Sequence, residues 1–227
     1  KPFIRSNVEG VFNLLEYFKV SPSLEKFVQV STDEVYGDMD SLRGKQYSDE
    51  SFPLRPSSYY SASKASADLL VMACARTFHI PYLITRSCNN FGPNQDPEKL
   101  LPKIFKCVSE GAPVPIYGDG GQSREWMHVD DNVAVIRGLT LSEAVENEIY
   151  NVGSGLHYTN LEIVKLIGGY AGKTIDYDHV ADRLGHDKSY RLDCSKLESF
   201  YGTITLLPLE GFLKDEVRRK KSTSNRK

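Results

Sequence analysis

The sequence predicts an α/β fold with a parallel sheet, followed by a smaller lobe of mixed helices and strands. Two short runs of β-forming residues, 26–31 and 82–86, flank a long helical segment at about 60–78. Apolar strands that alternate with helices pair in parallel, in a sheet covered on both faces. Beyond residue 95 the elements become shorter and less regular. We therefore assign 1–95 to the sheet domain and 96–227 mainly to a second lobe.

The helices are placed by apolar spacing and by residues that cap helix ends. Ser6-Asn7 is expected to cap a first helix, and Ser57 or Ser58 the long one. Thr159 followed by Glu162 predicts a capping box at the start of a later helix. The other expected elements are a loop over 37–58, helices near 100–108, 131–142 and the C-terminal end, and strands at 115–117 and 148–152, the last able to return to the sheet.

The composition is that of an ordinary globular protein. The 227 residues are 40% apolar and 26% charged, with a net charge of −2. The segment 218–227 carries six basic residues and no acid, so the remainder is strongly acidic. We expect a solvated tail and no nucleic-acid partner, because an acidic body offers no continuous basic surface.

The cysteine and apolar patterns exclude other classes. Four scattered cysteines form no C-x-x-C pair, which favours a reducing, cytoplasmic location. No apolar run approaches the ~20 residues of a membrane span, so no membrane partner is expected. The cluster of His128, Asp130 and Asp131 is expected to cap a helix, and no metal site is predicted.

Tyr60 and Lys64 are four residues apart, so on a helix their side chains share one face. A neighbouring ammonium group favours the phenolate and lowers the pKa of a tyrosine, which then can act as a base. Alone, this pattern is common and weak. Its position at the start of a helix that follows a strand makes a catalytic role credible.

The strand before that helix ends in Ser31-Thr32-Asp33-Glu34. Ligands of open α/β sheets bind beyond the carboxyl ends of the strands. Successive side chains diverge there, so Asp33 and Glu34 can act on different atoms of one substrate. The pattern therefore indicates one general acid and one general base.

Several ordered motifs resemble the extended short-chain dehydrogenase/reductase superfamily, and more narrowly the dTDP-glucose 4,6-dehydratase family. The resemblance covers most of the chain, from Asn7 to at least Tyr190. It rests on Ser31-Thr32-Asp33-Glu34-Val35-Tyr36-Gly37, Tyr60-Ser61-Ala62-Ser63-Lys64, Arg86-Ser87-Cys88-Asn89-Asn90-Phe91-Gly92-Pro93, Tyr117-Gly118-Asp119-Gly120, Arg124-Glu125-Trp126 and Asp182-Arg183-Leu184-Gly185-His186-Asp187.

The resemblance implies conversion of dTDP-glucose to dTDP-4-keto-6-deoxyglucose, with NAD recycled within each turnover. Tyr60, assisted by Lys64, would deprotonate the C4 hydroxyl, and Thr32 would hydrogen-bond the C4 oxygen. Glu34 would remove the C5 proton. Asp33, held protonated, would protonate the departing C6 hydroxyl.

The same matching assigns the binding residues. NAD would contact Asn7, Ser31, Tyr60, Lys64, Ser87 and Asn89. The dTDP-sugar would be held by Asn89, Glu98, Lys99, Leu100, Pro115, Tyr117, Arg124, Asn151, Arg183 and His186. A homodimer is expected through helices near 7–19 and 60–77.

One departure from the family is large. The glycine-rich loop that seats the cofactor pyrophosphate at a helix N-terminus is absent from this sequence. The implied fold is thus a Rossmann-type doubly wound parallel sheet whose N-terminal strands are missing, with a smaller α+β substrate lobe. The chain is expected to be a fragment or a truncated product, and by itself it can be inactive.

Three readings stay open. Besides the dehydratase, the chain can be another enzyme of the superfamily, such as a UDP-sugar 4-epimerase or a UDP-glucuronate decarboxylase, or a truncated non-catalytic paralogue. Epimerases lack the paired acids, and decarboxylases usually have Ser where Asp33 stands. Asp33 is therefore the discriminating residue.

Overall fold

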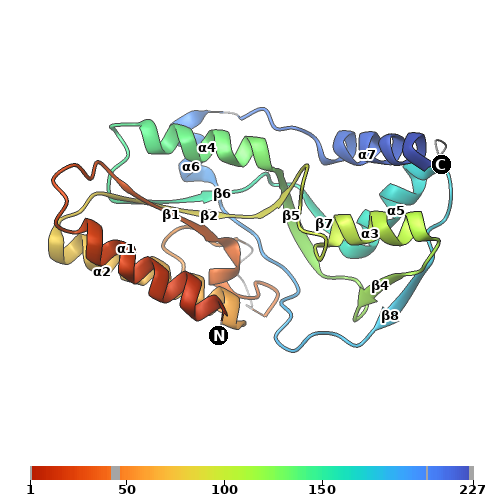
Figure 1. Cartoon of the computed structure of the whole chain (residues 1–227), viewed down its shortest axis with the longest axis horizontal. Coiled ribbons are helices and arrows are strands. Elements are labelled where there is room, and N and C mark those ends of the chain that lie inside the picture. Colours follow the sequence, from red (N-terminus) through yellow and green to blue (C-terminus); the bar gives the residue numbers. More distant parts are fainter. Residues whose placement is uncertain (1, 42–46, 203, 225–227) are drawn as a thin grey trace.

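A computed structural model describes residues 2–41, 47–202 and 204–224. It has two lobes, with a three-stranded parallel sheet in the first and three helices beside a two-stranded sheet in the second (Figure 1). The main sheet has the order β1 (Phe27–Thr32), β2 (Tyr82–Ser87) and β6 (Glu148–Val152), and both pairings are parallel. The predicted α/β class is thereby confirmed, and the strand at 148–152 pairs within this sheet.

Helices cover both faces of this sheet (Figure 1). On one face lie α1 (Gly10–Phe18) and α2 (Tyr59–Phe78), and α2 contacts β1 and β2. On the other face lie α4 (Val129–Leu141), against β2, and α6 (Ser195–Tyr201), against β6. The strands are mostly buried between these layers, as apolar parallel strands must be.

The long helix α2 begins where a cap was expected. The Ser58 hydroxyl accepts a hydrogen bond from the Ser61 backbone N–H at 3.0 Å, and the Ser61 hydroxyl accepts one from the Ser58 N–H at 3.1 Å. This reciprocal pair satisfies two backbone donors that the first helical turn leaves free. It fixes the start of α2, and with it the position of Tyr60.

The predicted cap at Ser6-Asn7 is wrong, because helical backbone already begins before Ser6. Residues Ile4–Glu9 form a π-helical turn that leads directly into α1. The Asn7 side chain does not cap this helix; its amide donates to the Ser63 hydroxyl of α2 at 2.9 Å. The Asn7 side chain therefore binds a residue of another helix instead of capping its own helix.

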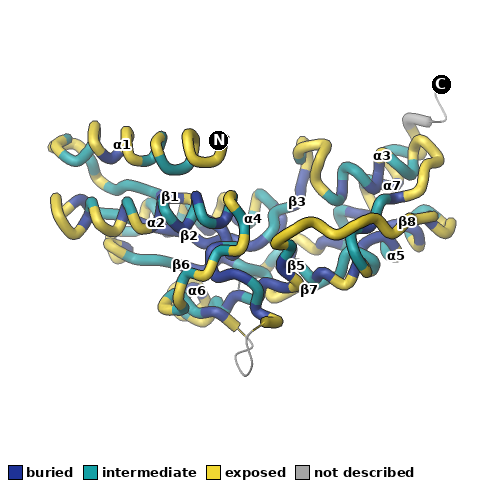
Figure 2. Tube along the Cα trace, turned by 90° about the horizontal axis from the view of Figure 1, so that it is seen from below, coloured by how far each residue is buried: buried dark blue, intermediate teal, exposed yellow. Residues whose placement is uncertain are grey.

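The second lobe surrounds its own apolar core. Its helices are α3 (Leu100–Glu110), α5 (Asn160–Ala171) and α7 (Leu209–Ser224). Their buried faces share one cluster with Phe91, Trp126 and Ile116. The parallel pair β4 (Val114–Tyr117) and β8 (Tyr177–Val180) forms its outer edge, and Figure 2 shows β8 exposed along its length.

A small sheet connects the two lobes. It has the order β3 (Asn89–Phe91), β5 (Ser123–His128) and β7 (His157–Thr159). None of these three strands was predicted, because β3 and β7 have only three residues and β5 contains several charged and polar residues. They carry Asn89 and Arg124, so this sheet positions part of the site.

Two local expectations about helix caps are confirmed. Thr159 and Glu162 form the predicted capping box at the start of α5. His128 Nδ1 accepts a hydrogen bond from the Asp130 N–H at 3.1 Å and caps α4. Among the described residues, no helix has both the length and the apolar character needed to cross a membrane.

Candidate active site

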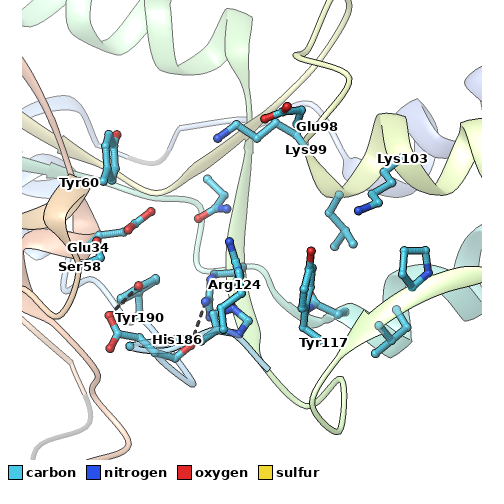
Figure 3. Close-up of a pocket in the computed structure, with 18 of the residues that line it drawn as sticks. Glu34, Ser58, Tyr60, Glu98, Lys99, Lys103, Tyr117, Arg124, His186 and Tyr190 are labelled. Carbon is cyan, nitrogen blue, oxygen red and sulfur yellow. Dashed lines mark hydrogen bonds between the residues drawn. The ribbon is translucent and has the colours of Figure 1, made fainter. Parts of the chain in front are cut away.

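A pocket of about 1090 Å³ lies between the two lobes. Figure 3 shows Glu34 and Tyr60 on the side of the sheet lobe, and Lys103 and Tyr117 on the opposite side. Eleven of the residues predicted from the sequence line it: Glu34, Tyr60, Asn89, Glu98, Lys99, Leu100, Pro115, Tyr117, Arg124, Arg183 and His186.

The two adjacent carboxylates diverge, as the sequence indicated. They open the short 3₁₀ turn Asp33–Tyr36 that follows β1, and the Thr32 hydroxyl caps this turn by accepting from the Glu34 N–H at 3.3 Å. Glu34 lines the pocket, whereas Asp33 is 2% exposed and accepts a hydrogen bond from the Thr32 hydroxyl at 3.1 Å. One carboxyl thus faces the pocket and the other lies in a dry environment beside it.

These environments change both acidities in the same direction. Burial, then the like charges of Glu34 and Glu125, raises the pKa of Asp33 well above its ordinary value. Burial also raises the pKa of Glu34, while the Arg124 guanidinium opposes that rise. Asp33 is therefore the carboxyl better suited to hold a proton, and Glu34 the one better suited to accept one.

Tyr60 and Lys64 share one helix, but their side chains do not interact as the spacing suggested. The Lys64 ammonium donates to the backbone carbonyl of Val30 on the edge strand β1. Burial and the carboxylates of Glu34 and Asp33 raise the pKa of Tyr60 to about 12, and the Thr32 hydroxyl opposes this. The expectation that Lys64 lowers the pKa of Tyr60 is thus not met in this structure.

The pocket has a cationic wall opposite the carboxylates. Arg124 donates to the backbone carbonyls of Ser123 (2.8 Å) and Asp187 (2.9 Å), and stacks over the Tyr190 ring at 4.6 Å. The Tyr117 ring lies between two cations, with Arg183 at 5.1 Å and Lys103 at 5.8 Å from its centroid. With Lys99, these groups suit an anionic ligand such as a diphosphate.

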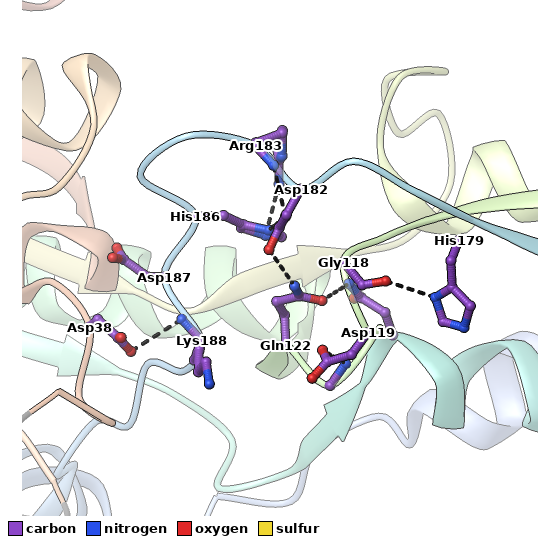
Figure 4. Close-up of polar contacts among 12 residues, drawn as sticks. Asp38, Gly118, Asp119, Gln122, His179, Asp182, Arg183, His186, Asp187 and Lys188 are labelled. Atoms are coloured by element: carbon purple, nitrogen blue, oxygen red, sulfur yellow. Dashed lines mark hydrogen bonds and ion pairs between the residues drawn. The ribbon is translucent and has the colours of Figure 1, made fainter.

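The loop that carries Arg183 and His186 is held by a polar network (Figure 4). Asp182 Oδ1 contacts His186 Nδ1 at 2.6 Å, and Asp182 Oδ2 accepts from Gln122 Nε2 at 3.0 Å. Arg183 Nη2 lies 3.0 Å from His186 Nε2, so the imidazole accepts there and donates from Nδ1 to Asp182. Burial lowers the pKa of His186, with Arg183 and Arg124 acting in the same direction and Asp182 opposing them.

Gly118 allows this network to form. Its φ of +56° is one that residues with a Cβ rarely adopt, and an added Cβ would lie 2.9 Å from Asp182 Oδ2. The turn after β4 therefore approaches the Asp182 carboxylate more closely than a side chain at this position would permit.

Asn151 does not reach the pocket. Its side chain is fully buried, donates to the carbonyls of Ser48 (2.9 Å) and Asp193 (3.0 Å), and accepts from the Tyr36 hydroxyl at 2.7 Å. The amide is thus used by protein partners, and the geometry does not support the predicted contact between Asn151 and the substrate.

The residues predicted to bind NAD lie near one another but mostly outside the pocket. Ser31 is buried at the end of β1, and Ser87 donates to the Asn132 side chain at 3.1 Å. Asn7 lies on the turn before α1, against Ser63. Only Tyr60 and Asn89 of this set line the pocket itself.

The sequence analysis missed the pocket residue Lys103 and a buried ion pair of Arg86 that lies outside the pocket. Lys103 lies one helical turn beyond Lys99, a spacing that could have revealed it. Arg86, with 3% of its side chain exposed, pairs with the fully buried Asp68 at 3.0 Å and donates to the Tyr36 hydroxyl at 2.9 Å. Within the described ranges, no group of three or more His, Cys, Asp or Glu is arranged to hold a metal ion.

Comparison with known proteins agrees with this geometry. The sequence profile of the NAD dependent epimerase/dehydratase family matches residues 1–153. The low-salt glycan biosynthesis protein Agl12 of Haloferax volcanii is 43% identical over 200 residues, which cover 88% of this chain and 63% of that protein. The dTDP-glucose 4,6-dehydratase of Streptomyces griseus is 42% identical over 201 residues, covering 88% of this chain and 60% of the enzyme. The chain thus spans about three fifths of the length of these two relatives.

Solved structures give the same picture. The dTDP-glucose 4,6-dehydratase DesIV of Streptomyces venezuelae, crystallised with NAD, superposes with a TM-score of 0.88 at 39% identity, covering 98% of this chain and 67% of that one. The UDP-glucuronic acid 4-epimerase of Bacillus cereus superposes with a TM-score of 0.90 at 26% identity, covering 98% and 69%. The profile and these similarities together show that the chain belongs to the NAD dependent epimerase/dehydratase family.

Proposed function

We propose that the full-length protein is a nucleotide-sugar 4,6-dehydratase that converts dTDP-glucose to dTDP-4-keto-6-deoxyglucose. The observation that carries this proposal is the pair of carboxyls beside Tyr60, with Glu34 in the pocket and Asp33 buried next to it. Loss of water across C5 and C6 needs a base on one carbon and an acid on the next, and these two groups supply both.

Oxidation at C4 is assigned to Tyr60. As a phenolate, Tyr60 would accept the C4 hydroxyl proton, and Thr32, which hydrogen-bonds Tyr60, is assigned to the same oxygen. With a pKa of about 12, Tyr60 is almost entirely protonated at neutral pH, so little of the phenolate base is present. Positive charge near the phenol is needed to lower that value, and a Lys64 ammonium turned from Val30 toward Tyr60 would supply it.

One half of an NAD molecule is assigned to the start of α2. Tyr60, Lys64 and the Asn7–Ser63 contact gather at the start of α2, beside the exposed edge of β1 where Val30 is 47% exposed. These groups suit the nicotinamide and its ribose. NAD, when bound, supplies the hydride acceptor. The glycine-rich pyrophosphate loop is not part of this sequence.

Elimination is assigned to the two carboxyls. Glu34 would take the C5 proton, which the adjacent C4 ketone makes acidic. Asp33 would give its proton to the C6 hydroxyl as water leaves. The hydride would then return to C6, and a proton from solvent would be added at C5. The net change is loss of one water from the sugar, with no net oxidation or reduction.

The cationic wall is assigned to the nucleotide diphosphate. Arg124, Arg183 and Lys99 bring positive charge to the pocket, and Arg124 is fixed by backbone carbonyls before any ligand binds. Such preorganisation reduces the entropy lost on binding. The thymine base is proposed from the relatives, which are dTDP-glucose dehydratases.

A homodimer and a cytoplasmic location are part of the same proposal. Figure 2 shows α1 exposed along most of its outer side. Large apolar side chains are exposed there, among them Phe12, Leu14 and Tyr17, and a second copy packed on α1 and α2 would cover such a surface. Light scattering of the full-length protein measures its oligomeric state and tests the homodimer.

Product analysis tests the reaction. With dTDP-glucose, the full-length protein should give the 4-keto-6-deoxy sugar without net NADH. Formation of the C4 epimer would instead assign the chain to the epimerases, and absence of bound NAD and of any turnover would indicate a non-catalytic paralogue. Asp33→Asn should still oxidise C4 but lose water slowly, and elimination at the wild-type rate would remove Asp33 from the acid role.

A further inference from the structure

Glu125 is a buried acid to which no step of the reaction has been assigned. It lies on β5 between Arg124 and Trp126, which both line the pocket, and it is 1% exposed. Successive side chains of a strand point to opposite faces, so Glu125 faces away from the pocket. It points toward the carboxyl ends of the main sheet.

The strand register places Glu125 close to Asp33. Thr32 pairs with Ser87, and Ser87 pairs with Val152, so Asp33, Cys88 and Gly153 directly follow three neighbouring strand positions. The Cys88 N–H still donates to the Val152 carbonyl at 3.0 Å, whereas Asp33 opens the 3₁₀ turn. Neighbouring strands are ~4.8 Å apart. A Cβ added to Gly153 would lie 2.2 Å from Glu125 Oε1, so the Glu125 carboxyl occupies the space beside this glycine. Cys88 therefore separates the two acids.

The surroundings of Glu125 hold one oxygen of its carboxyl in place and leave the other without a hydrogen bond among the described residues. Its Oε1 accepts from the Gly155 N–H at 2.6 Å. Its Oε2 has no hydrogen-bond partner among the described residues, and the nearest cationic candidate is His157 Nε2 at 3.9 Å. The thiols of Cys88 and Cys194 complete the cluster.

Asp33 is faced by charges of both signs. Glu34 acts on it from its own turn, Glu125 and Arg124 from β5, and Tyr60 lies next to it from α2. Burial and the flanking acids raise the pKa of the Cys88 thiol, so a neutral group stands between Asp33 and Glu125. Asp33 Oδ2, like Glu125 Oε2, is buried without a hydrogen-bond partner in the described structure.

We propose that Glu125 is a positioning residue that acts through Asp33: its buried carboxylate, one thiol away, keeps Asp33 in the protonated form that dehydration requires. The catalytic role of Glu125 rests on the proposed function. The electrostatic effect of Glu125 on Asp33 does not depend on which reaction the protein catalyses. Ionising Asp33 would place a second negative charge in the same buried region. Glu125 thereby favours the acid that must give its proton to the leaving hydroxyl.

The experiment is a titration of Asp33 in the full-length protein without substrate. Carboxyl carbon shifts of ¹³C-labelled aspartate are followed by NMR against pH, and the Asp33 signal is identified by its loss in Asp33→Asn. Glu125→Gln keeps an acceptor for the Gly155 N–H and removes the charge. The midpoint of the Asp33 titration should shift to lower pH in this variant. An unchanged midpoint would overturn the proposal.

Glu148→Gln is the matched control. It removes a glutamate at the other end of β6, where Glu148 pairs with Lys196, and should leave the Asp33 midpoint unchanged. If Glu125→Gln does not fold, ¹³C-labelled glutamate in the wild-type protein decides the question. Coupled acids titrate together, so the Glu125 signal should change across the Asp33 titration. Independent titration contradicts the coupling.

A kinetic readout separates this proposal from the proposed function. In single turnovers, Glu125→Gln should shift the alkaline limit of water loss to lower pH and slow that step more than C4 oxidation. A protein that shows the NMR shift but never dehydrates dTDP-glucose would refute the reaction and retain the coupling. A protein that dehydrates dTDP-glucose but whose Asp33 titration is unchanged by Glu125→Gln would support the reaction and refute the coupling.

Discussion

Replacing Arg86 by Met should destabilise the fold strongly, because it leaves a buried carboxylate without its partner. Arg86 donates to Asp68 at 3.0 Å, to the Tyr36 hydroxyl at 2.9 Å and to the Glu50 carbonyl at 3.3 Å. The two charged side chains are only 3% and 0% exposed. Breaking a buried pair from one side costs about 3–5 kcal/mol. For a chain of this length that corresponds to a fall in Tm of about 6–20 °C.

Denaturant unfolding monitored by circular dichroism measures this loss. The matched control is Arg191→Met, the same change at a pair with Asp40 that is 38% and 41% exposed, and it should cost less than about 1 kcal/mol. The double variant Arg86→Met/Asp68→Leu should recover a large part of the loss, because no unpaired charge remains. Equal costs for Arg86→Met and Arg191→Met, or a double variant as unstable as the sum of two single ones, would refute this reasoning.

Three further predictions follow from the site. Asp33→Asn should stabilise the fold by about 1–3 kcal/mol near neutral pH. Burial raises the pKa of the Asp33 carboxyl in the folded state, so the wild-type protein loses stability as the pH rises through that value. The higher denaturant midpoint of the variant should therefore approach the wild-type midpoint toward pH 4, and a difference that does not depend on pH would contradict this prediction. Tyr60→Phe should slow C4 oxidation by roughly 10²–10⁴-fold. Substrate affinity should change little, because the ring can keep its contact with Phe3. Calorimetric binding of dTDP measures the affinity separately from the rate. Gly118→Ala should lose more stability than Gly155→Ala. Both glycines have positive φ, but only at Gly118 would the added Cβ meet a neighbour, Asp182 Oδ2 at 2.9 Å; equal losses would show that this contact is unimportant.

The sequence predicted local features well. The capping box of α5 and the Ser58 cap of α2 depend on residues three apart, and such contacts are visible in a sequence. The divergence of Asp33 and Glu34 follows from their position at a strand end, which the β-forming run before them indicated. Eleven of the predicted residues share one pocket because their motifs lie at strand ends, at a helix start and on a loop that face each other between the two lobes.

The sequence could not predict features that depend on distant partners. The ammonium of Lys64 is directed by a carbonyl of β1, and no spacing within α2 shows this. Asn151 is occupied by Ser48 and Asp193, which approach it from segments far along the chain. The register that places Glu125 near Asp33 needs three paired strands and the lobe-connecting sheet.

The path of the hydride tests the central claim most directly. The full-length protein is given dTDP-glucose that carries deuterium at C4, and the product is examined by NMR and mass spectrometry. A dehydratase that recycles its cofactor must move the C4 deuterium to the C6 methyl group, while C5 acquires a proton from solvent. Deuterium retained at C4 of an epimerised sugar, or released with accumulation of reduced cofactor, would contradict the roles assigned to Tyr60, Glu34 and Asp33.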